Sequence, residues 1–325
     1  MQVVPPAQAR GAVAEVYAQA QRDFGVLAPP LALHSPAPAA LAAAWLLLRE
    51  TLLADGITRR AARESVAAGV SRANACPYCV DVHQAAHAVL QSSPDDAALA
   101  AWAQSAGGSG QRPHAAGAPF SAQEAPELLG VAVTFHYLNR MVSIYLADSP
   151  MPRRTPSFLR APIMRTVARA MRPRERGPVV PGRSLRLLPA APLPAGLEWA
   201  EPNPVVAEAL GRAAAAVDGA ALWLPEQVRG LVRARLAVWD GLPVGPSRAW
   251  LEDVLSELPS PDRAVARLAL LTAFAPYQVM AEDVAAVRMR YPSDQSLIEL
   301  TSWAALAAAV CLGGRLTACQ PTPER

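Results

Sequence analysis

The stretch that most constrains this chain is ESVAAGVSRANACPYCVDVH, residues 64–83, which carries a Cys-x-x-Cys pair between two expected helices. The spacing of Cys76 and Cys79 can bring their sulfurs within disulfide reach at the first turn of a helix. Pro77 suits an early helical position because it needs no amide partner there and its φ is already helical. A thiolate at such a helix start is nucleophilic, since exposed N–H groups and the helix dipole lower its pKa. His83 lies four residues after Cys79, so the two side chains share a face.

Glu64 is expected on the preceding helix. A start near Thr58 is indicated, because Thr is an acceptable N-cap and Gly56 ends the element before it. The helical stripe of Glu64 holds small or apolar residues, so we expect partial desolvation to raise the pKa of its carboxyl and suit it to proton transfer. Taken alone, Glu64 also fits a surface ion pair with Arg60 one turn earlier.

The pattern Glu-x11-Cys-x-x-Cys-x3-His, formed by Glu64, Cys76, Cys79 and His83, resembles the motif of alkyl hydroperoxidase D-like proteins. These proteins belong to the carboxymuconolactone decarboxylase-like superfamily, and the resemblance is strongest over residues 38–90. Such hydroperoxidases often carry a His between the two cysteines, where this chain has Tyr78, which we interpret as a packing residue. The resemblance implies a helical fold and no metal or tightly bound organic cofactor.

By the same resemblance, the chain is expected to be a thiol-dependent peroxidase or an allied disulfide oxidoreductase. Cys79 would attack a hydroperoxide as a thiolate, and Cys76 would capture the resulting sulfenic acid as a disulfide. His83 would hold or deprotonate the Cys79 sulfur, and Glu64 would relay protons. The relatives imply a lipoyl or thioredoxin-like dithiol reductant, attacking at Cys76 as the more accessible sulfur, and a homo-oligomer.

Three other interpretations stay open. The superfamily also contains lactone decarboxylases, which do not rely on a Cys-x-x-Cys pair. A non-enzymatic thiol redox sensor or assembly module would use the same two cysteines. A zinc site would need His83 and His87 to complete a Cys2His2 set, which one short helix would struggle to wrap around the metal.

The whole chain is predicted to be all-α, because its 52% hydrophobic content is rich in Ala with few β-branched runs. Its 325 residues allow two domains. Residues 151–190 hold ten Arg, seven Pro and one acidic residue, which indicates a linker that adheres to acidic faces of its own domains, or a basic surface for an anionic partner. We expect a flexible loop at 104–119.

The part of the chain from Pro204 onward partly repeats the first part. An offset of 167 residues aligns the two segments but replaces all four motif positions, for example Glu64 by Leu231 and Cys76 by Pro243. We therefore predict two tandem alkyl hydroperoxidase D-like helical domains: a redox-active one at 1–150, a linker at 151–195 and a degenerate copy at 196–325. A helix at Arg263–Met280 is expected in the second copy.

The composition also bears on location and partners. Net charge of +3 is too slight to indicate a nucleic-acid partner. The N-terminus lacks a secretory signal pattern, and the apolar window at 31–48 is too interrupted for a membrane span. Four cysteines fit a cytoplasmic redox protein better than a disulfide framework. The remaining polar or thiol candidates are given structural roles: His136, Asn139, Arg140, Cys311 and Cys319.

Overall fold

The computed structural model describes residues 1–106, 118–152, 154–171 and 177–316, and within these ranges the chain is helical and has no strand. The all-α prediction is confirmed. The helices of the first half are α1 (Gly11–Asp23), α2 (Pro29–Ala32), α3 (Pro38–Leu47), α4 (Arg60–Ala73), α5 (Pro77–Ala88), α6 (Asp95–Ala106) and α7 (Ala125–Tyr145). The later helices are α8 (Ser157–Ala170), α9 (Pro204–Ala220), α10 (Glu226–Val238), α11 (Trp250–Ser256), α12 (Ser260–Phe274), α13 (Ala281–Arg288) and α14 (Asp294–Leu316). Short 3-10 turns occur at Pro6–Gln8, Leu185–Leu187, Glu198–Ala200 and Pro276–Gln278.

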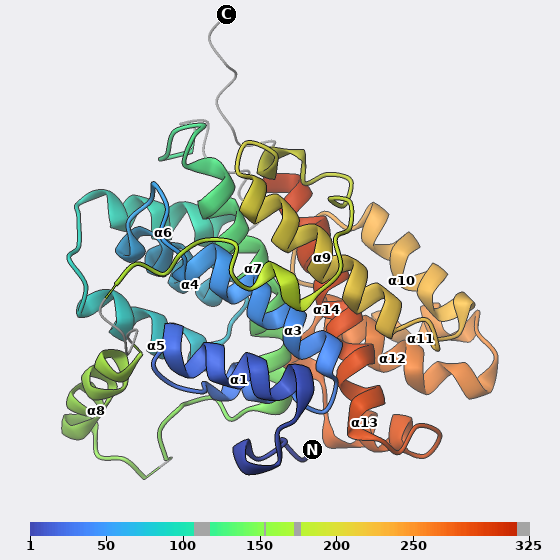
Figure 1. The fold of residues 1–325 in the computed structure, drawn as a ribbon. Helices are drawn as coiled ribbons and strands as arrows, with labels where there is room; N and C mark the ends of the chain where they lie inside the picture. The colour runs from blue at the N-terminus through green and yellow to red at the C-terminus, as the bar shows by residue number, and fades with distance from the viewer. Residues whose placement is uncertain (107–117, 153, 172–176, 317–325) are drawn as a thin grey trace, which may run out of the picture.

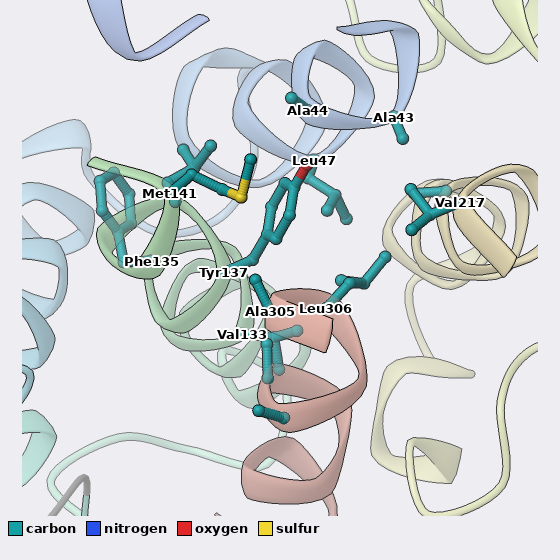
Figure 2. Packing of buried hydrophobic residues seen from close by; sticks show 14 of the residues in the cluster. Ala43, Ala44, Leu47, Val133, Phe135, Tyr137, Met141, Val217, Ala305 and Leu306 are labelled. Atoms are coloured by element: carbon teal, nitrogen blue, oxygen red, sulfur yellow. The ribbon is translucent and has the colours of Figure 1, made fainter. Parts of the chain in front are cut away.

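The centre of the molecule is built from α3, α7, α9 and α14, which lie side by side in Figure 1. α7 packs on α14 and α4, and α3 packs on α9. Figure 2 shows Tyr137 of α7 pointing toward α3 beside Leu47, and its hydroxyl donates to Ser302 Oγ of α14 at 3.2 Å. One continuous hydrophobic cluster thus includes residues from both sides of the expected linker. The tandem division into 1–150, 151–195 and 196–325 stays a prediction.

α3 forms as the sequence suggests, from an Ala- and Leu-rich run with Pro38 at its first position. It continues into a π-helical turn at Leu48–Leu53, which contains a buried ion pair between Arg49 and Glu50 at 2.6 Å. α14 is long and apolar enough to span a membrane by length and composition, but most of its surface is buried in the core. From the sequence, only residues 31–48 were considered as a possible membrane span, and α14 was not.

Two expected helix boundaries are wrong. α4 begins at Arg60 without a cap from Thr58, whose hydroxyl donates to the Glu127 carboxylate instead. α12 ends at Phe274, not Met280, because Pro276 cannot continue the helix.

The Arg/Pro-rich segment contains a helix, α8, in spite of Pro162 within it. α8 packs on α5 through a narrow buried stripe that contains Met164 and Ala168. Further on, the segment adheres to the first half: Gly182 N donates to the Glu50 carboxylate at 2.7 Å. Arg186 pairs with Glu15 at the surface, at 2.5 Å. Most of the expected loop at 104–119, and Cys319, lie outside the described residues.

Candidate active site

The cysteine pair lies at the start of α5, as the spacing predicts. Cys76 is the N-cap residue and Pro77 occupies the first helical position. The turn that leads into the pair bends at Ala75, whose φ of +49° is left-handed and strained for a residue other than glycine. Cys76 and Cys79 are 1% and 3% exposed, so both sulfurs are buried. The expectation that Cys76 is the more accessible sulfur is therefore wrong.

The two sulfurs differ in their preference for the negative charge. The Cys79 side chain, its backbone N–H and the Ser143 side chain hydrogen-bond to Cys76 and lower the pKa of the Cys76 thiol, although burial opposes the shift. The pKa of the Cys79 thiol is raised well above its ordinary value by its hydrogen bond to Cys76, by burial and by the Cys76 charge. Of the two thiols, Cys76 therefore gives up its proton more readily than Cys79, whereas the resting thiolate was expected at Cys79.

His83 is held by a buried hydrogen bond to the neighbouring helix. Its Nδ1 lies 2.6 Å from Oε2 of Glu64, and the other carboxylate oxygen of Glu64 accepts from Arg60 at 2.6 Å. The Phe135 ring packs against the imidazole edge-to-face, with ring centroids 4.4 Å apart. The side chain of Glu64 has no exposed surface. From the sequence, Arg60 was expected at most to form a surface ion pair with Glu64. In the structure it joins the buried hydrogen-bond network of Glu64 and His83.

The carboxyl of Glu64 is ionised rather than protonated. Burial alone would raise its pKa, but the charges and hydrogen bonds of Arg60 and His83 outweigh burial and lower the pKa to about 2. The expected upward shift is wrong, because Arg60 and His83 both pack against the buried carboxylate, which no local sequence pattern indicates. An ionised Glu64 accepts a hydrogen bond from Nδ1–H of His83. Nε2 is therefore the nitrogen that His83 can use as a base.

A mostly apolar cavity of about 160 Å³ opens beside the pair. Cys79, His83 and Tyr78 are among the residues that line it, whereas Cys76 is not. The apolar walls come from several elements: Phe24, Val26, Leu27, Ala28, Pro29, Pro30, Leu31, Leu48, Val82, Phe135, Leu138 and Met171. Burial and the nearby sulfur charges raise the pKa of Tyr78 to about 12, so its phenol is a neutral hydrogen-bond donor.

The four predicted residues thus lie in one site, although not all in direct contact. Within the described ranges no hydrogen bond joins His83 to either sulfur, so the imidazole and Cys79 meet through the cavity that both line. A molecule in the cavity can touch both groups at once. This gives proton transfer a route through a bound substrate or water.

The other candidates lie elsewhere. His87 turns to Asp96, at 3.0 Å, rather than toward the sulfurs. Asn139 bonds Ser71, and His136 bonds Asn74 across the α4–α7 contact. The sulfur of Cys311 donates to the Leu236 carbonyl at 3.3 Å in the second half.

Sequence reasoning missed two kinds of contributor. Ser143 reaches Cys76 from α7, far along the chain, and no local pattern marks it. Residues 24–31 form part of the cavity wall, but in the sequence they show only a Pro-rich stretch. Both depend on how helices pack, which short motifs do not encode.

Known proteins resemble this chain in two ways. Residues 39–122 match the sequence model of the Carboxymuconolactone decarboxylase family. Over 323 residues the chain is 39% identical to a Mycobacterium tuberculosis (strain H37Rv) protein named alkyl hydroperoxide reductase Rv2159c, an alignment that covers 95% of this chain and 92% of the relative.

Proposed function

Because the chain belongs to the carboxymuconolactone decarboxylase family, we propose that it is a thiol-dependent alkyl hydroperoxide reductase. The observation that carries this proposal is the apolar cavity that Cys79 and His83 share, with Glu64 buried behind the imidazole. The name of the Mycobacterium tuberculosis relative supports the same activity.

In the proposed first step, the Cys79 sulfur attacks the outer oxygen of a hydroperoxide. The Cys79 proton passes to the Cys76 thiolate, and the O–O bond breaks to leave a Cys79 sulfenic acid and an alkoxide. The alkoxide takes its proton from water, relayed by Nε2 of His83, while Nδ1 stays hydrogen-bonded to Glu64. Cys76 then attacks the sulfenic acid, water leaves, and a Cys76–Cys79 disulfide forms.

A dithiol returns the pair to the reduced state. The cavity reaches Cys79 and not Cys76, so a small dithiol such as a lipoyl group meets the Cys79 sulfur first. Attack there expels Cys76, whose lowered pKa makes it the better leaving thiolate. The second thiol of the reductant then releases Cys79, and the reductant becomes a disulfide. The sum is reduction of one hydroperoxide to an alcohol and water for each dithiol oxidised. This replaces the expected attack at Cys76.

The cavity also bears on the choice of substrate. A largely apolar space near 150 Å³ is large enough to accept a benzene-sized group. An organic hydroperoxide with a short alkyl or aryl body therefore gains apolar contacts that hydrogen peroxide lacks. We propose a preference for organic hydroperoxides.

Steady-state turnover of cumene hydroperoxide with dihydrolipoamide tests the function. Wild type and Cys311→Ser should turn over repeatedly, whereas Cys76→Ser and Cys79→Ser should each lose turnover. Wild-type protein that oxidises once and stops would make it a sensor rather than an enzyme. Decarboxylation of a carboxymuconolactone that survives the double Cys76→Ser, Cys79→Ser change would place it with the lyases of the family.

A further inference from the structure

Arg140, near the end of α7, is a cation that the proposed reaction does not use. It is only 4% exposed, and no carboxylate among the described residues pairs with it. Its Nε donates to the Ala273 carbonyl at 3.0 Å, and its Nη1 donates to the His136 carbonyl at 2.6 Å. Two carbonyl oxygens are thus its partners, and Nη2 remains for another acceptor. Burial lowers the pKa of Arg140 to about 10, so the guanidinium is still charged at neutral pH.

Arg140 lines a second cavity, of about 210 Å³, that shares no lining residue with the one at Cys79. Asn74 and Ala75, the two residues before Cys76, form one side of this space. The far side comes from the second half of the chain, with three aromatic residues and neighbouring Gly and Pro positions: Trp239, Gly241, Pro243, Phe274, Pro276 and Tyr277. Trp239 and Phe274 pack edge-to-face with centroids 5.1 Å apart.

These features specify the ligand by charge and by shape. A buried guanidinium that meets only carbonyl dipoles gains most from an anion that enters beside it. The site supplies one guanidinium and the amide of Asn74, which suits the two oxygens of a carboxylate. His136 adds no charge, because burial and Arg140 hold its pKa well below the ordinary value. A phosphate, with more charge and more oxygens, would find too few donors among aromatic walls.

We propose that this cavity binds a small organic carboxylate, with its carboxylate on Arg140 and its apolar body against Trp239, Phe274 and Tyr277. Because Asn74 and Ala75 border the cavity, the ligand lies behind the turn that positions Cys76. This is a binding site separate from the hydroperoxide cavity, and its existence does not depend on the proposed reaction.

Calorimetric titration of the full-length reduced protein with benzoate tests the proposal, with the isosteric but uncharged benzamide as comparison. Benzoate should bind once per chain and benzamide at least about tenfold more weakly, since it cannot form the charge-assisted pair. Arg140→Gln should weaken benzoate by a similar factor, and exposed Arg235→Gln should not. Inorganic phosphate should not displace benzoate.

Tyr277→Ala supplies an independent test, because Tyr277 is 46% exposed and its removal leaves the guanidinium in place. If Arg140→Gln fails to fold, this variant decides: it should weaken benzoate binding several-fold. Absence of benzoate binding by folded wild type, equal binding of benzamide, or benzoate binding unchanged in Tyr277→Ala would each overturn the assignment.

Discussion

Glu64 holds Arg60 and His83 with its two carboxylate oxygens, at 2.6 Å each. Glu64→Gln keeps an acceptor for the imidazole but removes the charge that fixes its tautomer. The rate of Cys79 oxidation by cumene hydroperoxide should then fall by about a hundredfold or more, the range for loss of general acid–base assistance. Rapid-mixing measurement of thiol loss at neutral pH checks this.

The control for this change is Glu208→Gln, which removes an exposed carboxylate that pairs with Arg212. It should oxidise at the wild-type rate. Glu64→Gln oxidising as fast as the control would show that the buried carboxylate plays no part in proton transfer.

The second prediction concerns the pH dependence of the free energy of unfolding and rests on His34. Burial lowers its pKa to about 4, with opposition from the Leu31 and Pro30 carbonyls. Between its ordinary value of 6.5 and about 4 the unfolded chain therefore binds more protons than the folded one. The free energy of unfolding should fall as the pH is lowered through that window, by up to about 3 kcal/mol from this residue.

His34→Leu should flatten this dependence in urea unfolding measured across the window. A variant at His34 with the full wild-type slope would mean that this histidine is protonated as readily in the folded state as in the unfolded chain.

The contact between α4 and α6 depends on a glycine. A Cβ on Gly69 would lie 2.3 Å from the Ala100 carbonyl oxygen and 2.9 Å from the Ala103 Cβ. Gly69→Ala should destabilise the fold by about 1–3 kcal/mol, because the two helices must separate. Gly230 in α10 has nothing within 4 Å of such a Cβ, so Gly230→Ala should stabilise by about 0.5–1 kcal/mol. Urea unfolding of both variants should show changes of opposite sign in the free energy of unfolding. Two changes of the same sign would contradict the packing described for Gly69 and Gly230.

At this scale the sequence was informative where local rules decide. Pro77 and the Cys-x-x-Cys spacing correctly predicted the start of α5. The structure also brings Glu64 into contact with His83, which lines the same cavity as Cys79. The predicted N-cap at Thr58 is wrong, because the Thr58 hydroxyl donates to Glu127, 69 residues away. α8 was not anticipated, since its Arg- and Pro-rich composition hides a narrow apolar stripe.

Site chemistry was harder to predict than site membership. The direction of the Glu64 pKa shift depends on Arg60 packing against it, and the lowered pKa of Cys76 depends on hydrogen bonds from Cys79 and, across the helix contact, from Ser143 of α7. The cavity at Cys79 exists only because residues 24–31 pack across α5 and α7. Each is a property of helix packing between distant segments.

The whole molecule should unfold as one cooperative unit. Its main hydrophobic cluster runs from α1 to α14, and Gly313 of α14 lies so close to α7 that an added Cβ would sit 2.5 Å from Val133 Cγ2. Hydrogen exchange measured by mass spectrometry should therefore give peptides of α3 and α9 the same highest opening free energy. Independent opening of α9 to α14 at a lower free energy would instead indicate two separately stable domains.

The most direct measurement of the central claim is the mass of the peptide spanning residues 73–90 after one equivalent of cumene hydroperoxide. We predict that the wild-type peptide loses two hydrogens, as Cys76 and Cys79 join, and that the Cys76→Ser peptide gains one oxygen at Cys79. A wild-type peptide of unchanged mass, or a Cys79→Ser peptide that gains its oxygen at Cys76 as fast as wild type reacts, would contradict the account.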